Sequence, residues 1–511
     1  MEKKLPKLGG IYAYYIDALQ KYGACQIIGL TDKSACYVSL DCLTDHLPGK
    51  DEILKCQPFF MERYRYHHSM DTDWIDLTPP PPSYHCLGEF PLVTDKVSDS
   101  YSGIWPDGSS YISECFWKSL DEEVRTAYKK HMTSGEDVLI HGKMFRKGRP
   151  RLTDDLYNHL NERDSLAQFP CILSAQVEGF SEKLTSLIKT APLLRELKLK
   201  NPGVSVLNLR GTGLNNLDLD MTGVKKLYLP EGVQRLYLYG DIEQELIIDD
   251  SACEIKVQHL FLLISLKKVP LSRFGMEKSR VSALFLKDIA EIDAAEIVAY
   301  FPDLEVLRMT GCPGVVKNIQ VLGQLSKLQE LSVRDLFGFG MEFMEGIAQM
   351  PELWELNCES IPKDVGTEIK KKWKGKIAVL SMTKLRDENW MKENIDNPLR
   401  HWDGSEFVPP AAYKKSLQCY KNTGKKLLEA ASREEILRIA QEYTEEFNKL
   451  NKKYQEFIES EERDDIFDAM KQLYEDCVVR RFAEGENVAG NGLDITWEEI
   501  DKVIEEMRED W

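Results

Sequence analysis

The sequence predicts an α+β protein of several domains, with a small β-rich N-terminal domain, a central solenoid and an acidic helical bundle at the C-terminus. Three observations predict this organisation. Short aromatic and β-branched runs separated by turn residues open the chain, Leu-x-Leu steps recur through its centre, and apolar residues at helical spacing fill its last part. A length of 511 residues also exceeds what one hydrophobic core usually organises.

The N-terminal prediction comes from residues 9–16, 22–30 and 35–40, which are short runs rich in aromatic and β-branched side chains. Such runs between turn residues are typical of strands in a small twisted sheet or barrel. The prolines of residues 78–83 predict an extended connector. Residues 85–92 then follow as another edge strand or as a cap.

The order of these segments also carries a resemblance. Gly-x-Ile-Tyr-Ala-Tyr, Tyr-Gly-Ala-Cys-Gln-Ile, an apolar run and Cys86-Leu-Gly-Glu-Phe-Pro-Leu92 follow one another in about the first 95 residues. In this the segment resembles a family of small bacterial immunity-type domains that are associated with polymorphic toxin systems. The resemblance implies a β-rich domain that binds a protein partner without performing catalysis.

The central prediction comes from an internal repeat with two spacings. Five steps are separated by 10, 10, 10 and 9 residues, and five further steps by 24, 23, 24 and 25 residues. The first set comprises Leu197/Leu199, Leu207/Leu209, Leu217/Leu219, Leu227/Leu229 and Leu236/Leu238. The second set comprises Leu260/Leu262, Leu284/Leu286, Leu307/Met309, Leu331/Val333 and Leu356/Cys358.

The longer spacing accommodates a strand, a turn and a helix in each unit. Apolar residues at helical intervals predict helices over residues 181–191, 293–302, 319–328 and 343–350. The shorter spacing is too short for a helix in every unit. Either alternate steps form strands on opposite faces of coils of roughly 20 residues, which we favour, or the coils are thin and lack helices.

Three segments carry a second resemblance. Leu194-x-x-Leu197-x-Leu199-x-x-Pro202, Leu304-x-x-Leu307-x-Met309-x-x-Cys312 and Leu328-x-x-Leu331-x-Val333 resemble the L-x-x-L-x-L-x-x-N/C consensus of leucine-rich repeats. The likeness extends over about residues 180–382, and among these segments only Cys312 stands in for the ladder asparagine. A leucine-rich-repeat solenoid is therefore implied, with irregular units.

These patterns predict domains at residues 1–135 (β-rich), 136–180 (linker or cap), 181–385 (solenoid) and 386–511 (acidic helices). Residues 143–151 form a basic run that we expect to be an exposed loop between domains. In the last domain, residues 415–431, 432–451 and 454–473 have apolar residues at helical intervals. Ser432-x-x-Glu435 and Thr496-Trp-Glu-Glu499 are capping boxes that predict helix starts.

Charge and composition restrict the location and the partners. The net charge is −18, and residues 421–511, with 25 acidic and 14 basic residues, carry −11 of it. An acidic chain argues against nucleic-acid binding and favours a protein partner, possibly a basic one. The absence of a signal sequence and of a membrane-length apolar run, together with 12 scattered cysteines, predicts a cytoplasmic protein with reduced thiols.

Catalytic signatures are absent from the sequence, which contains no G-x-x-x-x-G-K-S/T, H-E-x-x-H, G-x-S-x-G or H-R-D. We therefore expect no enzyme activity, no cofactor and no metal. The alternative is an enzyme of unknown class in the N-terminal domain. Its candidate residues are His67, His68 and His85, with Cys86, Asp71 and Asp73 as further metal ligands. In the C-terminal domain, His401 and Asp403 could form a base and orienting pair, but we expect the aromatic turn that carries them to be a docking wedge between domains.

The binding face follows from the repeat. If the leucines of each Leu-x-Leu step enter the core, the residues between and beside them lie on the opposite face of the strand. The predicted binding residues are Lys198, Lys200, Arg210, Tyr228, Tyr237, Tyr239, Arg308 and Arg334. The same face includes Asn208, Asp218, Phe285, Lys287, Thr310, Ser332, Asn357 and Glu359. Tyrosine and arginine are frequent interface anchors, and Tyr228, Tyr237 and Tyr239 are expected to form one patch.

Overall fold

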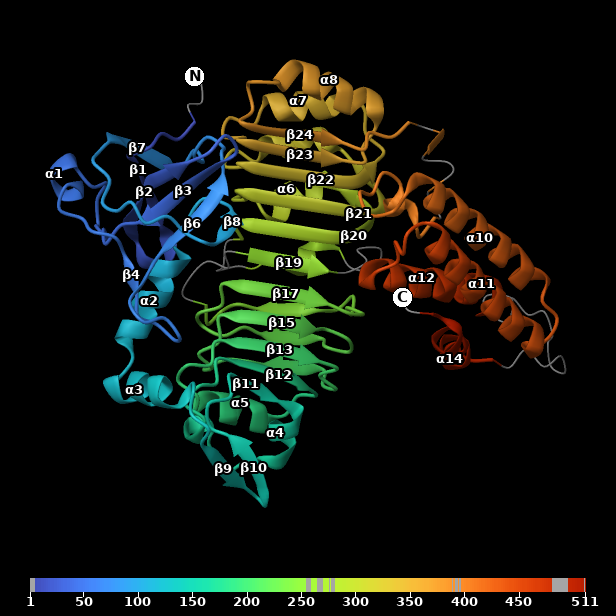
Figure 1. Cartoon of the computed structure of the whole chain (residues 1–511), viewed down its shortest axis with the longest axis horizontal. Coiled ribbons are helices and arrows are strands. Elements are labelled where there is room, and N and C mark those ends of the chain that lie inside the picture. The colour runs from blue at the N-terminus through green and yellow to red at the C-terminus, as the bar shows by residue number, and fades with distance from the viewer. Residues whose placement is uncertain are drawn as a thin grey trace. The chain divides into compact units, whose positions relative to one another are not determined.

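The structure is a computed structural model of mixed α/β architecture with several sheets (Figure 1). It describes residues 5–253, 259–263, 270–274, 276, 281–387, 389–390, 394, 397–479, 495–509 and 511. The chain divides into two compact units, Met1–Leu385 and Arg386–Trp511.

The first unit opens with a six-stranded sheet in the order β7-β1-β2-β3-β6-β8. Its strands are β1 (Gly10–Ile16), β2 (Lys21–Leu30), β3 (Ser34–Ser39), β6 (Thr72–Asp76), β7 (Tyr84–Glu89) and β8 (Tyr101–Gly103). The short elements η1 (Asp17–Leu19), α1 (Lys50–Ile53), β4 (Phe60–Met61) and β5 (Ser69–Met70) lie between them in the chain. Among the described residues no sheet closes into a barrel, and the predicted edge strand at residues 85–92 is confirmed as β7.

Both faces of this sheet are covered, which explains its long apolar runs. In β1, Tyr12 and Tyr14 enter a cluster on one face, and Ile11 and Ala13 enter a second cluster on the other. The last part of the predicted β-rich domain, up to residue 135, contains helices that were not predicted from the sequence. That part forms two helices, α2 (Ser109–Ser119) and α3 (Glu122–His131), because Tyr111, Glu114 and Trp117 recur every three residues and are buried together.

The centre of the first unit is an eleven-stranded sheet, and every pairing in it is parallel. Figure 1 shows these strands as one ladder from β11 to β24. In order they are β11 (Arg151–Thr153), β12 (Ser174–Glu178), β13 (Glu196–Lys200), β15 (Asn216–Asp220), β17 (Arg235–Tyr239), β19 (His259–Leu263), β20 (Ala283–Asp293), β21 (Val306–Lys317), β22 (Glu330–Phe337), β23 (Glu355–Glu359) and β24 (Val379–Thr383). We call this the main sheet.

The leucines of the Leu-x-Leu steps lie directly opposite one another across these strands. Leu197 pairs with Leu217, which pairs with Leu236, and Leu284 pairs with Leu307. The second position of each step is aligned in the same way, and the described members of both rows in β13–β23 are buried in one core. The period of two in the sequence thus becomes a buried face and an outer face of the main sheet.

A residue with left-handed backbone conformation recurs just after the last outer position of several strands. Asn201, Gly240, Asp288 and Asp335 have φ values of 43°, 90°, 55° and 49°. Gly, Asn and Asp are the residues that adopt this conformation at least cost. Their recurrence lets the chain leave successive strands at the same point.

The steps of the shorter spacing are divided between two sheets. The steps at Leu207 and Leu227 belong to a second, three-stranded parallel sheet of β14 (Val206–Asn208), β16 (Lys226–Tyr228) and β18 (Ile247–Asp249). The steps at Leu197, Leu217 and Leu236 belong to the main sheet. Alternate steps therefore form strands of different sheets, as the favoured alternative predicts.

Helices connect the strands elsewhere and pack on the buried face of the main sheet. The predicted helices at residues 181–191, 293–302 and 343–350 are confirmed, whereas the predicted helix at residues 319–328 is a 3-10 helix over Ile319–Gln324 only. The connecting elements are α5 (Glu182–Lys189), η3 (Leu271–Phe274), α6 (Ala294–Tyr300), η4 (Ile319–Gln324), α7 (Glu342–Ala348) and α8 (Lys363–Trp373).

The expected linker at residues 136–180 is folded. It contains a hairpin of β9 (Asp137–Ile140) and β10 (Lys143–Arg146), the first two strands of the main sheet, α4 (Asp154–His159) and η2 (Leu166–Gln168). The basic run at residues 143–151 is therefore not a loop throughout. Phe145 is buried between exposed Met144 and Arg146, and this alternation makes a strand.

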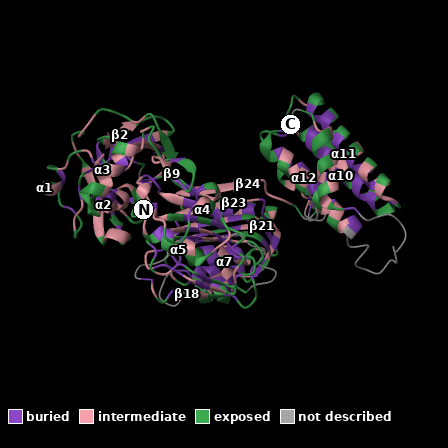
Figure 2. Ribbon diagram, turned by 90° about the horizontal axis from the view of Figure 1, so that it is seen from below, coloured by how far each residue is buried: buried purple, intermediate pink, exposed green. Residues whose placement is uncertain are grey.

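The second unit is helical, with η5 (Arg400–Trp402), α10 (Pro410–Glu429), α11 (Arg433–Lys453), α12 (Ser460–Tyr474), η6 (Glu475–Val479) and α14 (Trp497–Met507). Buried and exposed residues alternate along α10 and α11 (Figure 2). The Thr496–Glu499 capping box is confirmed. At Ser432, one half of the predicted capping box forms, since the Ser432 hydroxyl accepts a hydrogen bond from the Glu435 backbone amide. The Glu435 carboxylate accepts from the backbone amide of Ala431 and not from that of Ser432. None of the described helices is long and apolar enough to cross a membrane.

The leucine rows make a direct prediction about stability. Leu217→Ala removes a fully buried side chain from the middle of its row and should lower the free energy of unfolding by about 2–5 kcal/mol. Asn216→Ala in the same strand changes a partly exposed outer residue and should cost about 0.5 kcal/mol or less. Urea denaturation followed by circular dichroism measures both. Equal losses would contradict the assignment of the two faces.

Candidate functional site

The outer face of the main sheet is the candidate functional site. It consists of three aligned rows of side chains, one before, one between and one after the two buried positions of each strand. The aligned pairs Lys198–Asp218 and Arg334–Glu359 are examples of neighbours in these rows. Because the register is regular, residues far apart in sequence form one continuous surface.

Six of the eight predicted binding residues lie on this outer face. Lys198 and Lys200 are on β13, Tyr237 and Tyr239 on β17, Arg308 on β21 and Arg334 on β22. Lys198, Lys200, Arg308 and Arg334 are exposed, and both tyrosines are half-buried.

The other two, Arg210 and Tyr228, lie elsewhere. Tyr228 is on β16 of the second sheet, and the Arg210 guanidinium lies 4.5 Å from the centre of its ring and 2.6 Å from Asp249 on β18. The expectation of one patch containing Tyr228, Tyr237 and Tyr239 is therefore wrong. Steps 10 residues apart alternate between two sheets, so only Tyr237 and Tyr239 share a strand.

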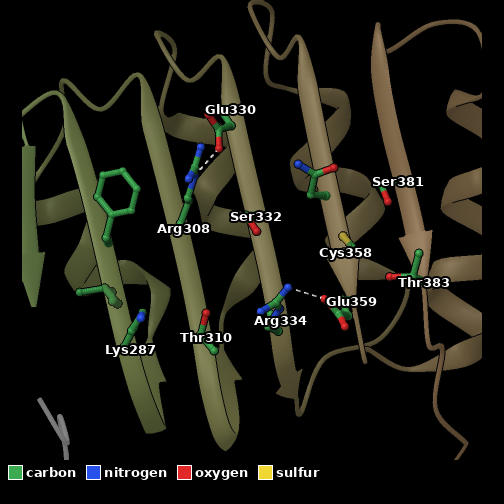
Figure 3. A pocket seen from close by; sticks show the side chains of 13 residues that line it. Lys287, Arg308, Thr310, Glu330, Ser332, Arg334, Cys358, Glu359, Ser381 and Thr383 are labelled. Atoms are coloured by element: carbon green, nitrogen blue, oxygen red, sulfur yellow. Dashed lines mark hydrogen bonds and ion pairs between the residues drawn. The ribbon is translucent and has the colours of Figure 1, made fainter. Parts of the chain in front are cut away.

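The C-terminal half of the outer face is hollowed (Figure 3). The hollow measures about 490 Å³ and spans β20 to β24. Hydroxyl and amide side chains form much of its lining, which comprises Phe285, Leu286, Lys287, Arg308, Thr310, Glu330, Ser332, Arg334, Asn357, Cys358, Glu359, Ser381 and Thr383. Pockets that hold small ligands measure about 300–1,000 Å³, so this hollow is large enough for one or two side chains of a partner.

Both arginines of this hollow are paired with acids on the next strand (Figure 3). Arg308 donates to Glu330, and its guanidinium lies 5.2 Å from the centre of the Phe285 ring. Arg334 lies 2.6 Å from Glu359. These pairs hold long flexible side chains in one orientation, so a ligand that contacted them would lose less side-chain entropy on binding.

Two carboxyls of this face have shifted pKa values in opposite directions. Burial raises the pKa of the Glu355 carboxyl, and the neighbouring Glu330 carboxylate raises it further. Burial also acts to raise the pKa of the Glu359 carboxyl, but Lys384 and Arg334 outweigh it and hold that pKa below its usual value. Glu359 is therefore firmly ionised, and Glu355 is the carboxyl that protonates more readily.

The N-terminal half of the outer face has a smaller hollow across β11 to β17, and Tyr237 lines it. Lys198 lies 3.1 Å from Asp218 on the neighbouring strand. Arg151 donates to the Gln176 side-chain oxygen at 3.1 Å. This half thus repeats the arrangement of the other, with cross-strand polar pairs beside an aromatic ring.

The structure does not bring the candidate metal ligands together. The His68 ring stacks on the Phe60 ring, with the ring centres 4.1 Å apart. Its Nδ1 atom lies at hydrogen-bond distance, 2.9 Å, from the Glu62 carboxylate. His85 is exposed on β7 at the edge of the six-stranded sheet, with its ring 6.2 Å from that of Tyr22. Among the described residues no group of three or more His, Cys, Asp or Glu side chains could hold a metal ion.

The candidate pair of His401 and Asp403 is also separated. His401 and the indole of Trp402 both contact Asp465, at 2.7 and 2.8 Å, whereas Asp403 pairs with Arg386 at 2.6 Å. Trp402 is buried in the core of the helical unit. The aromatic turn therefore packs inside this unit.

Sequence reasoning missed Glu330, Ser381 and Thr383. Glu330 lies one position outside the Leu-x-Leu step, and the last strand was not recognised as a step because its sequence is Val379-Leu-Ser-Met-Thr383. The signal was present, since Leu380 and Met382 continue the two buried rows.

No protein-family model matches the sequence, and comparison with curated proteins and with solved structures finds no similar protein.

The raised pKa of Glu355 predicts how stability responds to pH. A carboxyl whose pKa is higher in the folded than in the unfolded state stabilises the fold below about pH 4.3, and this contribution is lost as the pH rises through the folded value. Glu355→Gln keeps an oxygen for the Asn357 amide and removes the charge. Its urea midpoint should exceed that of the parent protein at pH 7, with the difference shrinking towards pH 4.

The control is Glu352→Gln, which changes an exposed carboxylate shortly before β23. It should leave the midpoint unchanged at both pH values. A lower midpoint for Glu355→Gln at pH 7 would mean that the Glu355 charge stabilises the fold, contrary to the burial argument.

Proposed function

We propose that the first unit is a leucine-rich-repeat solenoid whose outer strand face binds another protein, and that the chain is a non-catalytic binding protein. The observation that carries the proposal is the continuous outer face of the main sheet, on which aromatic rings and paired arginines lie in register. A face of this kind offers large contact area and directional donors, the two properties of interface anchors.

The charge of this face supports a protein partner that presents both acidic and basic side chains. The described residues of its three rows include seven bases and seven acids, so the face is neutral although the chain carries −18. The bases are Arg151, Lys198, Lys200, Arg235, Lys287, Arg308 and Arg334, and the acids are Glu178, Glu196, Asp218, Asp220, Glu330, Glu355 and Glu359.

The negative charge lies mainly in the other unit. Residues 386–511 contain 31 acidic and 19 basic residues, a net charge of −12, which leaves −6 for residues 1–385. A basic partner would therefore be attracted to the helical unit more than to the outer face. The partner of the outer face need not be basic.

The resemblance of the N-terminal segment to immunity-type domains supports the narrower proposal that the chain is a bacterial scaffold or toxin-neutralising protein of the cytoplasm. Both kinds of protein act by binding, and the six-stranded sheet gives the N-terminal segment the β-rich architecture that the resemblance implies. An enzyme site around His67, His68 and His85 gains no support, since His68 and His85 have separate partners.

The proposal is tested by a photo-crosslinking amino acid at one of two positions. With p-benzoylphenylalanine at position 237, on the outer face, irradiation in the native host should capture a specific protein. The same residue at position 228, on the second sheet, is the matched control and should not capture it. Capture of the same protein from both positions, or from position 228 alone, would contradict an outer-face site.

The captured protein then permits a quantitative prediction. Tyr237→Ala should weaken its binding by about thirtyfold, equivalent to about 2 kcal/mol, as truncation of a central interface tyrosine commonly does. Lys198→Ala, which removes a base already paired with Asp218, should change affinity less. Tyr228→Ala should leave affinity unchanged. Isothermal titration calorimetry measures the three constants, and circular dichroism checks that each variant is folded.

A further inference from the structure

The N-terminal part of the first unit contains a larger hollow than either of those on the outer face. It measures about 1010 Å³ and is formed by residues of β3 to β6, by the segment between β7 and β8 and by the start of α2. Among its lining residues are Tyr37, Phe60, Tyr66, Arg63, Asp71 and Ser110. No part of the predicted binding face contributes to it.

Asp71 is the buried charged group of this hollow. Its residue is 8% exposed, and its backbone is fixed on both sides, since its amide donates to Phe59 and its carbonyl accepts from Ser39. The carboxylate accepts a hydrogen bond of 2.8 Å from the Ser110 hydroxyl. A neutral hydroxyl does not neutralise a buried carboxylate, which is costly to keep away from water without an opposite charge.

One of the two bases of the hollow, Arg63, is engaged mainly by other groups and is linked to Asp71 through the Ser110 hydroxyl, to which its guanidinium donates at 3.5 Å. The Arg63 guanidinium lies 5.0 Å from the centre of the Tyr66 ring and 3.8 Å from the Glu114 carboxylate, which is itself 1% exposed. Arg63 also acts on Asp71 through space, but burial prevails and raises the pKa of the Asp71 carboxyl. Arg63 therefore does not supply the full counter-charge that an ionised Asp71 needs.

The remaining lining residues leave the hollow negative. Its four aspartates exceed its two bases by two charges, counting histidine as neutral, and the charged residues are Asp41, Asp71, Asp73, Asp99, Arg63 and Lys96. Its walls also carry the rings of Tyr37, Phe60 and Tyr66. Aromatic faces attract cations, so the negative charge and the aromatic rings of the hollow both favour a cationic ligand.

We propose that this hollow binds an organic cation, the guanidinium or ammonium group of an arginine or lysine side chain from another protein, with Asp71 as the carboxylate that receives it. The inserted cation would complete the ion pair that the chain itself leaves incomplete, and the aromatic walls would cover its alkyl stem. The volume of the hollow, about 1010 Å³, is at the upper end of the usual size of ligand sites, about 300–1,000 Å³. This inference is independent of the outer-face proposal.

The test titrates the full chain with short blocked peptides by isothermal titration calorimetry. The probes are acetyl-Gly-Arg-Gly-amide and the same peptide with citrulline, which has nearly the shape of arginine without its charge. A second pair compares lysine with acetyl-lysine. The unmodified protein should bind at least one charged peptide at least tenfold more tightly than its neutral counterpart. Equal binding within both pairs, or no binding of any peptide, overturns the proposal.

The variant Asp71→Asn assigns the binding to this carboxylate. Asparagine has the size of aspartate and keeps an oxygen that accepts from Ser110, but it carries no negative charge. The discrimination between charged and neutral peptides should therefore disappear. The thermal midpoint should not fall, because a buried charge has been removed. Asp45→Asn, an exposed aspartate near Lys21 outside the hollow, is the matched control and should bind as the parent does.

Two results for peptide binding and stability of the variant overturn the proposal, and a third concerns metal binding. One is retained discrimination between charged and neutral peptides, which places the cation site elsewhere. The other is a lower thermal midpoint with unchanged peptide binding, which makes Asp71 a structural partner of Arg63. Saturable binding of Mg²⁺ or Ca²⁺ that Asp71→Asn abolishes also overturns it, because the hollow would then be a metal site. The peptide comparison on the unmodified protein holds even if the variant fails to fold.

Discussion

The first unit depends on one constraint, the in-register stacking of buried side chains across the parallel strands of the main sheet. Two such rows, which include Leu197 and Leu199, continue from strand to strand from β12 to β23. A shift of one residue in any strand would move its leucines to the outer face and its polar residues into the core. The hydrophobic effect thereby fixes the register, and the register fixes the outer face.

The properties of the outer face follow from that register. Residues at equivalent positions become lateral neighbours, so Lys198 meets Asp218 and Arg334 meets Glu359. Such exposed pairs add little stability individually. Together they make a surface whose acidic and basic side chains balance and lie next to one another. Most of the negative charge of the chain lies in the helical unit instead.

The sequence predicted the features that repeat at a regular spacing or follow a short local motif. The Leu-x-Leu steps, most of the connecting helices and the Thr496 helix start are local patterns, and each is found where expected. Features that depend on which strands become neighbours could not be predicted from the sequence. The spacing of 10 residues left two arrangements open, and only the pairing of β14 with β16 shows that Tyr228 and Tyr237 belong to different sheets.

The same reason explains the sites that sequence reasoning misplaced or overlooked. Asp71 was considered only as a metal ligand because histidines precede it in the chain, whereas its neighbours in the fold are Ser110 of α2 and the rings of the N-terminal core. Likewise, His401 lies beside Asp403 in sequence and contacts Asp465 instead. The most direct measurement of the central claim is a cryo-electron microscopy structure of the chain with its captured partner. It should show the partner on the outer face of β13–β24, in contact with Tyr237 or the Arg308 and Arg334 pairs. A partner that contacts only the second sheet, the N-terminal sheet or the helical unit would contradict it.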